Sequence, residues 1–314
     1  MEKFVSSWSD GEKLPESYIF PPERRPGNNA EGLNRSVIIQ QIMQASQEFG
    51  FFQVISHGVP CTLLNDARDF FEEFFALPAE DKIDLCSTDE SKNCIYLTSN
   101  VDYDTEDRHN WRDTLRLNCS PLEECKQGWT RKPTRFRDIA EKYIVELICE
   151  GLGVEQGYLT KELTRKQLLV VHRYPACPDP SLTSGTRNHK DPGLIVILLQ
   201  GKVSGLQVLN DGQWIGIPPL PDAFLINIGY VLELISNGKL VSVEHRVLTN
   251  KERARVSAAF LIIPEDKCVI EPAKAIVNTG NSPIYKSFRF SEFYKLFRAA
   301  YNGHTDNLVG KLMI

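Results

Sequence analysis

The pattern of apolar positions changes near Gln167. Before this residue, apolar side chains recur every three or four positions, which is the spacing of amphipathic helices. Helices are therefore predicted over residues 36–49 and 136–150, and another over 63–75, with a short strand at 51–55. A further helix is predicted from about Pro78, because the fixed φ of proline suits a first helical turn. Residues 1–33 are rich in proline, glycine and charge, which is typical of an irregular arm. The polar segment 86–133 indicates loops with short strands.

After Gln167 the chain consists of short apolar runs separated by turn residues. These runs are 168–171, 194–199, 206–209, 214–217, 223–228, 241–247 and 256–263. Asn210-Asp211-Gly212 predicts a hairpin turn between two of them. Many strands at this spacing favour a double sheet or jelly roll, and an amphipathic segment at 290–300 predicts a final helix across it.

The predicted fold is therefore α+β with a mainly β core. We expect a double-stranded β-helix (jelly roll) over residues 167–314, ending in the C-terminal helix. Residues 1–166 would form an N-terminal arm and helical layer that supports it.

Composition narrows the class of protein. The 314 residues carry a net charge of −5 with a pI near 5.8, so a broad basic surface for nucleic acid or anionic membrane is not expected. No apolar run reaches 18 residues, and residues 1–10 lack the apolar stretch of a signal peptide. Eight cysteines without a CxxC pair are typical of reduced thiols. We expect a cytoplasmic monomer that binds a small molecule.

Two histidines and one carboxylate are the first candidate for chemistry. His189 and Asp191 lie two residues apart, so on a strand both side chains point the same way, and His245 follows several strands later. Such a set covers one face of an octahedral ferrous ion and leaves three positions open. An isolated HxD, however, is more often a surface loop, and single histidines often serve structural hydrogen bonds.

Arg255 and Ser257 form the second candidate, ten residues after His245. A buried arginine without a partner is costly, whereas an arginine beside a hydroxyl can hold a carboxylate ligand. The alternative is a salt bridge at the rim, because Arg255 ends the charged run 251–255.

The order of these residues resembles the plant 2-oxoglutarate- and iron(II)-dependent dioxygenases, in particular the branch that contains hyoscyamine 6-hydroxylase. The resemblance covers residues 37–297. Besides HxD, the distal histidine and RxS, its landmarks are QEFGFFQV (47–54), SHGVP (56–60), FALP (75–78), YPACP (174–178), SGLQV (204–208), NIG (227–229), SNG (236–238) and SVEHRV (242–247).

The resemblance implies a set of roles. The iron(II) ligands would be His189, Asp191 and His245. Arg255 and Ser257 would bind the far carboxylate of 2-oxoglutarate, with a hydrogen bond from the Tyr174 hydroxyl. His172 stands where the family usually has asparagine and is also expected at the co-substrate. O2 would be the second co-substrate, with ascorbate in support.

The expected reaction is hydroxylation or oxidative demethylation of a small hydrophobic specialised metabolite, with an alkaloid as one candidate, and release of succinate and CO2. Tyr230 replaces the family's usual aspartate, and the usual strand before the first helix is missing. Two alternatives stay open. One is a member that the missing segment has inactivated and that only binds a small molecule. The other is an oxidase that does not use 2-oxoglutarate, against which the intact Arg255 and Ser257 argue. The acidic run 102–107 is either a solvated loop or an attractor of a cationic amine.

Overall fold

The computed structural model describes residues 29–314 except 58, 60, 126–160, 278–281 and 303–307. Its core is a seven-stranded sheet in which all neighbours are antiparallel. In spatial order its strands are β1 (Phe51–Val54), β9 (Phe224–Ile228), β6 (Ile195–Gln200), β11 (Arg255–Ile263), β4 (Lys166–Tyr174), β3 (Asp113–Asn118) and β2 (Cys94–Thr98).

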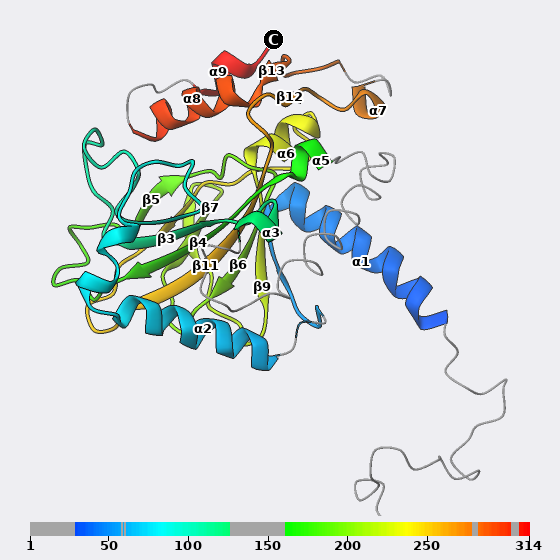
Figure 1. The fold of residues 1–314 in the computed structure, drawn as a ribbon. Coiled ribbons are helices and arrows are strands. Elements are labelled where there is room, and N and C mark those ends of the chain that lie inside the picture. The colour runs from blue at the N-terminus through cyan, green and yellow to red at the C-terminus, as the bar shows by residue number, and fades with distance from the viewer. Residues whose placement is uncertain (1–28, 58, 60, 126–160, 278–281, 303–307) are drawn as a thin grey trace, which may run out of the picture.

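A second, four-stranded antiparallel sheet lies against the first (Figure 1). Its strands are β5 (Thr186–His189), β10 (His245–Val247), β7 (Leu206–Asn210) and β8 (Gln213–Gly216). The predicted hairpin joins β7 to β8, and Asp211 (φ 49°) and Gly212 (φ 76°) adopt the left-handed conformation that tight hairpin turns need. The predicted jelly roll is thus confirmed.

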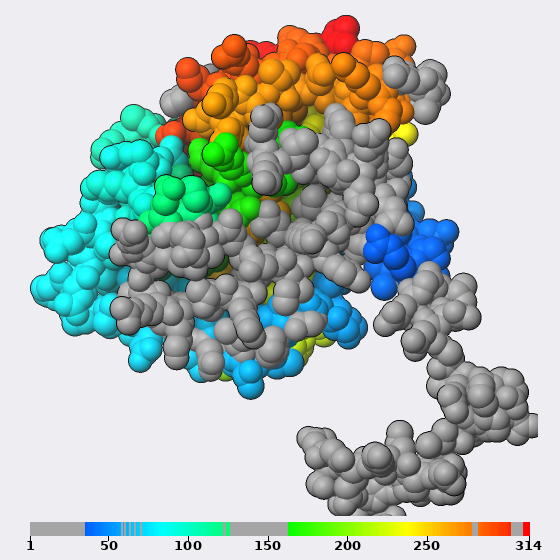
Figure 2. All heavy atoms as spheres, turned by 45° about the vertical axis from the view of Figure 1, so that its right-hand side comes forward, coloured from blue at the N-terminus to red at the C-terminus, as the bar shows by residue number. Residues whose placement is uncertain are grey.

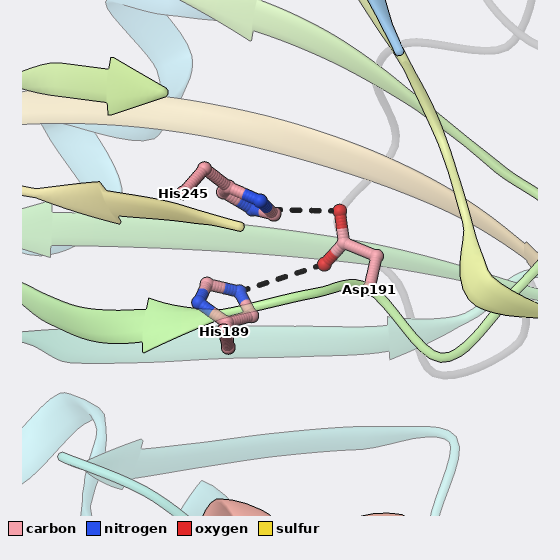
Figure 3. A group of neighbouring side chains, drawn as sticks. All are labelled: His189, Asp191 and His245. Carbon is pink, nitrogen blue, oxygen red and sulfur yellow. Dashed lines mark ion pairs between the residues drawn. The ribbon is translucent and has the colours of Figure 1, made fainter. Parts of the chain in front are cut away.

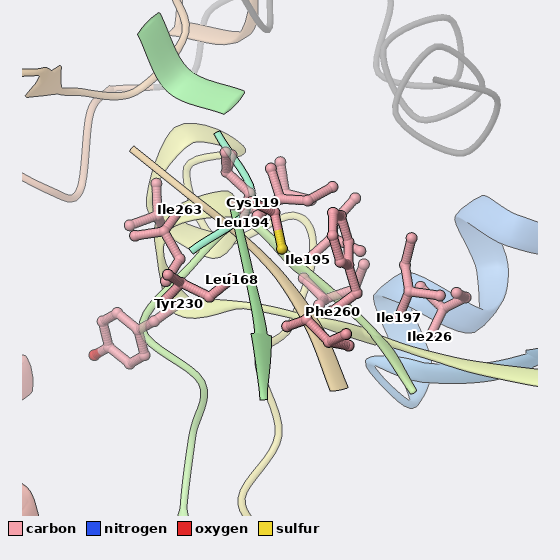
Figure 4. Close-up of a cluster of buried hydrophobic side chains, with 14 of the residues drawn as sticks. Cys119, Leu168, Leu194, Ile195, Ile197, Ile226, Tyr230, Phe260 and Ile263 are labelled. Carbon is pink, nitrogen blue, oxygen red and sulfur yellow. The ribbon is translucent and has the colours of Figure 1, made fainter. Parts of the chain in front are cut away.

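Side-chain alternation gives the large sheet two different faces. On β11, Ala258, Phe260 and Ile262 face the main hydrophobic core, where Figure 4 shows Phe260 beside Ile197 and Ile226. Helix α2 (Cys61–Ala76) covers this face with buried apolar side chains. The alternate residues of the strand, such as Ser257 and Ala259, point to the other face, which lines a cavity. The polar site therefore lies on the face that α2 does not cover.

The remaining helices surround the two sheets. Helix α1 (Asn29–Glu48) precedes β1, α6 (Tyr230–Ile235) follows β9, and four short helices are α3 (Leu122–Cys125), α5 (Lys161–Thr164), α7 (Lys274–Val277) and α9 (Leu308–Leu312). Helix α8 (Phe290–Tyr301) and the short pair β12 (Val269–Ile270) and β13 (Phe288–Arg289) form a C-terminal cap, coloured orange to red along the upper edge in Figures 1 and 2.

Several predicted elements differ from the structure. The first helix begins at Asn29, so the predicted arm is wrong from that residue on. The helix predicted from residue 78 is replaced by two 3-10 turns, Ala79–Asp81 and Ile83–Leu85. Only the last three residues of the run 241–247 form a strand, because backbone N–H groups before them bond to other elements, as Val241 does to the carbonyl of Ser46.

Some expectations can be compared with the structure only in part, because not every residue is described. The helix predicted at 136–150 lies outside the described residues. Seven cysteines in the described part are free thiols, as predicted. The division at residue 166 stays a prediction, and strands β1, β2 and β3 from before it pair with β9 and β4 from after it. Within the described ranges, no helix has both the length and the apolar character needed to span a bilayer.

Candidate metal and co-substrate site

His189, Asp191 and His245 meet at one end of the small sheet (Figure 3). His189 ends β5 and His245 begins β10, and these two residues are direct partners in the antiparallel pair. Asp191 lies two residues beyond β5, where its carbonyl accepts the N–H of Tyr230 (2.7 Å). The Nε2 atoms of both histidines lie 3.5 Å from a carboxylate oxygen of Asp191. All three donor atoms lie within 4.8 Å of one another.

Backbone carbonyls orient both imidazole rings. Nδ1 of His189 donates to the carbonyl of Arg187 (2.9 Å), and Nδ1 of His245 donates to that of Val243 (3.2 Å). A carbonyl can only accept, so each ring carries its proton on Nδ1 and turns the Nε2 lone pair toward Asp191. This is the arrangement of histidines that ligate a metal.

Electrostatics keep the ligands in the protonation states that a cation needs. Burial by itself would raise the pKa of Asp191, but His245, His189 and a hydrogen bond from Asn227 outweigh it and bring this pKa to about 2. Burial, together with His189, lowers the pKa of His245 to about 4, against the opposite effect of Asp191. At neutral pH the carboxylate is ionised and His245 is neutral, so both can bind a divalent metal without first losing a proton.

Asn227 is a site residue that the sequence reasoning did not select. It lies on β9, is 3% exposed, and donates from Nδ2 to Oδ2 of Asp191. The available signal was a polar residue inside the apolar run 223–228, since a buried amide needs a specific partner.

Arg255 and Ser257 lie on β11 of the large sheet, on the face that lines the cavity, and form the candidate co-substrate end of the site. Arg255 is 2% exposed and donates to Ser257 Oγ (2.9 Å) and Gln200 Oε1 (3.5 Å). It has no carboxylate partner among the described residues, so the alternative of a rim salt bridge is wrong. Two further donors, Arg255 Nε and Gln200 Nε2, are buried without an acceptor among the described residues. A buried guanidinium with spare donors and no counter-charge fits a bound carboxylate.

Tyr174 and His172 reach this end from β4. In the sheet register, Arg255 is opposite Tyr174 and Ser257 is opposite His172. The Tyr174 hydroxyl lies 3.1 Å from Thr186 Oγ1, and its ring lies 5.1 Å from Cζ of Arg255.

His172 is held from the neighbouring strand β3. Its Nδ1 lies 3.0 Å from Thr114 Oγ1, and Thr114 is its partner in the β3–β4 register. Burial, followed by the charges of Arg112 and Arg255, holds the pKa of His172 well below its usual value. This imidazole is therefore neutral and can act as a hydrogen-bonding group.

One cavity of about 260 Å³ connects the two ends, and all seven predicted site residues line it: His172, Tyr174, His189, Asp191, His245, Arg255 and Ser257. The two other histidines in the described part of the chain, His57 and His109, take no part. His57 bonds to the carbonyl of Asp222, and His109 pairs with Glu106. His304 lies outside the described residues.

Asp102 and Glu106 are bound by basic side chains. Asp102 pairs with Arg298, and Glu106 is buried and pairs with Arg187 (3.0 Å). The prediction of a solvated loop is therefore wrong for these two residues.

The sequence of the chain matches known proteins with this type of site. Residues 165–264 match the family model of the 2OG-Fe(II) oxygenase superfamily, and residues 26–138 match that of the non-haem dioxygenase in morphine synthesis N-terminal region. Protein DOWNY MILDEW RESISTANCE 6 of Arabidopsis thaliana is 39% identical over 94% of each chain. Hyoscyamine 6-dioxygenase of Hyoscyamus niger is 38% identical over 95% of each chain.

Solved structures give the same result. The crystal structure of JOX2 in complex with 2OG, Fe and JA has a TM-score of 0.72 and 30% identity, covering 95% of this chain and 96% of that one. The rice dioxygenase for auxin oxidation has a TM-score of 0.71 over 92% of this chain, at an identity of 21% that supports the fold alone. The chain belongs to the 2OG-Fe(II) oxygenase superfamily and is a dioxygenase that uses iron(II) and 2-oxoglutarate.

Proposed function

We propose that this dioxygenase oxidises a C–H bond of a small hydrophobic plant metabolite. In the balanced reaction, substrate R–H, O2 and 2-oxoglutarate give R–OH, succinate and CO2. The observation that carries the proposal is the cavity that joins the His-Asp-His set to Arg255, which has no carboxylate partner among the described residues. The bound iron would supply the activation of O2, and the protein orients and shields the reactants.

The residues of the chain would divide the work. His189, Asp191 and His245 would hold iron(II) through the atoms that already converge. Arg255 and Ser257 would bind the far carboxylate of 2-oxoglutarate by charge-assisted hydrogen bonds. The ring of Tyr174 supports the Arg255 guanidinium from one side.

His172 would take the place of an amide donor in the family. Thr114 engages its Nδ1, so Nε2 is the ring atom that remains to contact 2-oxoglutarate.

The rest of the cavity favours an apolar substrate that is kept from water. Its wall continues along the same sheet face and onto α8, with Leu168, Val170, Ala259, Leu261 and Phe297. Apolar walls exclude water and strengthen the charge interactions inside the site.

The proposal is tested by succinate formation from 2-oxoglutarate in the presence of iron(II) and ascorbate. We expect Asp191→Ala to abolish it, whereas Asp84→Ala, which changes an exposed aspartate of a 3-10 turn, should not. A protein that binds neither iron nor 2-oxoglutarate would contradict the proposal. Ligand binding without turnover across a plant metabolite panel would support the alternative of a binding protein. Oxygen uptake without 2-oxoglutarate would support an oxidase.

The product screen should be mass spectrometric, since hydroxylation adds an oxygen atom and demethylation removes a methyl group. Alkaloids, phenolics and hormones form the initial panel. A monomeric state and a cytoplasmic location remain expectations, which gel filtration and cell imaging would test.

A further inference from the structure

The charges that line the cavity are not balanced. Four arginines line it, which are Arg112, Arg116, Arg255 and Arg298. Arg116 is paired with Glu90, and Arg298 is paired with Glu90 (3.0 Å) and Asp102. These two arginines and two carboxylates balance one another.

This pairing leaves Arg255, which would bind 2-oxoglutarate, and Arg112. Arg112 immediately precedes β3, is half-buried, and donates from Nε to the carbonyl of Ser99 (3.0 Å) and from Nη1 to Thr186 Oγ1 (2.7 Å). Both acceptors are neutral. Its Nη2 has no hydrogen-bond partner, and the guanidinium no ion pair, among the residues that the structure describes. The neighbouring Asp113 lies on β3 and accepts a hydrogen bond from Thr98 instead (2.8 Å).

Arg112 is close to the co-substrate end but separate from it. Thr186 Oγ1 contacts both Arg112 Nη1 and the Tyr174 hydroxyl (3.1 Å). The Tyr174 ring in turn lies against Arg255. Tyr174 thus contacts Arg255 through its ring and is linked to Arg112 through Thr186, and both guanidinium groups line the cavity that also holds the metal-binding residues.

The charge count with both co-substrates bound favours one further anion. Iron(II), Arg255 and Arg112 bring four positive charges, and Asp191 and the two carboxylates of 2-oxoglutarate bring three negative charges. One substrate carboxylate would balance the cavity. A substrate amine would add to its positive charge, and the cavity carboxylates Glu90 and Asp102 are already paired.

We propose that the organic substrate is a small carboxylic acid whose carboxylate binds to Arg112. This inference rests on the proposed function and adds the chemical class of the substrate. The acid would place its carboxylate at Nη2 of Arg112 and its apolar part against Val170 and Phe297.

The size of the cavity restricts the acid further. Its volume of about 260 Å³ lies just below the range of about 300–1,000 Å³ that is usual for ligand pockets. Because 2-oxoglutarate occupies part of this volume, the acid should be of the size of one ring or one short chain.

The test uses the full chain with Mn(II) in place of iron, saturated with 2-oxoglutarate under argon. Calorimetry would measure the binding of benzoate, phenylacetate and hexanoate, and of benzamide, phenylacetamide, hexanamide and benzylamine as neutral and cationic counterparts. We expect the acids to bind more tightly than their amides, and the amine not to bind. Arg112→Met should weaken the binding of the acids by about 10- to 100-fold, as expected for a lost hydrogen bond to a charged group.

Controls separate this effect from a loss of fold or of co-substrate. Arg112→Lys keeps the charge and should retain part of the affinity, while 2-oxoglutarate should bind both variants as it binds the wild type. Arg173→Met changes an arginine of β4 that does not line the cavity, and it should leave acid binding unchanged.

Two outcomes would overturn the inference. One is equal binding, or no binding, of acids and amides. The other is an Arg112→Met variant that loses 2-oxoglutarate instead, which would assign Arg112 to the co-substrate. If the wild-type protein turns over 2-oxoglutarate, either outcome would leave the proposed function intact. Wild-type protein that does not bind 2-oxoglutarate would overturn both.

Discussion

Replacing Asn227 by leucine tests how Asp191 is held at the metal site. The side chain of Asn227 is buried and donates to Oδ2 of Asp191, the oxygen that faces His245. Leucine has a similar volume and shape but cannot donate, so the substitution removes this hydrogen bond with little change in packing. Asp191 stays ionised at neutral pH, because the two histidines that lower its pKa remain.

The expected magnitude follows from the type of bond that is lost. A hydrogen bond to a charged group contributes about 1.5–3 kcal/mol, which corresponds to about 10- to 150-fold in a dissociation constant. Substitution of a residue that hydrogen-bonds to a metal ligand typically weakens metal binding by about 10- to 100-fold, in agreement with this value. We therefore expect iron(II) to bind Asn227→Leu about 10- to 100-fold more weakly, while the rate of succinate formation recovers at high iron.

The assay is an anaerobic titration of metal-free protein with iron(II) in competition with a chelator, followed by succinate formation over a range of iron concentrations. Asn65→Leu, an exposed asparagine on α2, serves as the matched control. Wild-type iron affinity in a folded Asn227→Leu variant would refute the reasoning. Activity that iron does not restore would show that Asn227 does more than position the carboxylate.

Three further predictions concern stability. The pKa of His245 is about 4 in the folded state against about 6.5 unfolded, so the unfolded state takes up the extra proton between these values. Between pH 7 and 4, His245 should contribute about 3 kcal/mol to the unfolding free energy that metal-free protein loses in urea titrations, so His245→Asn should lose about that much less than the wild type. Gly185→Ala would place Cβ 2.7 Å from Cδ1 of Tyr174, so a loss of about 1–3 kcal/mol and weaker 2-oxoglutarate binding are expected; an unchanged melting temperature would argue against this overpacking. Arg298→Met removes the ion pairs of Arg298 with Asp102 and Glu90 and should cost about 1 kcal/mol of unfolding free energy, with partial recovery in Arg298→Lys and a smaller loss at high salt.

The C-terminal cap contacts the site through charged and aromatic side chains. The Arg187 guanidinium lies 4.7 Å from the Tyr301 ring centroid, and this ring lies 5.8 Å from that of His189. Arg187 also pairs with the buried Glu106. Arg187 thus holds Tyr301, at the end of α8, beside the metal-binding residues, and the ion pair with Glu106 fixes Arg187 itself.

Much of the local structure could be predicted from the sequence. Alternation of side chains along β11 places Arg255 and Ser257 together, and Asp211-Gly212 permits the left-handed turn between β7 and β8. These features depend on neighbours within a few residues, which is the range over which periodicity and turn chemistry act. The helix predicted from residue 78 was wrong because the fixed φ of Pro78 suits the start of a 3-10 turn as well as that of an α-helix.

The tertiary structure decided which distant residues meet. His189 and His245 become partners only because β5 pairs with β10, and Asn227 reaches Asp191 only because β9 lies at this end of the large sheet. The sequence pattern also left open whether Asp102 would be solvated, since its partner Arg298 lies on α8 near the other end of the chain. Periodicity reports which way each side chain points along its own element, whereas the burial and charge balance of a site depend on which elements pack together.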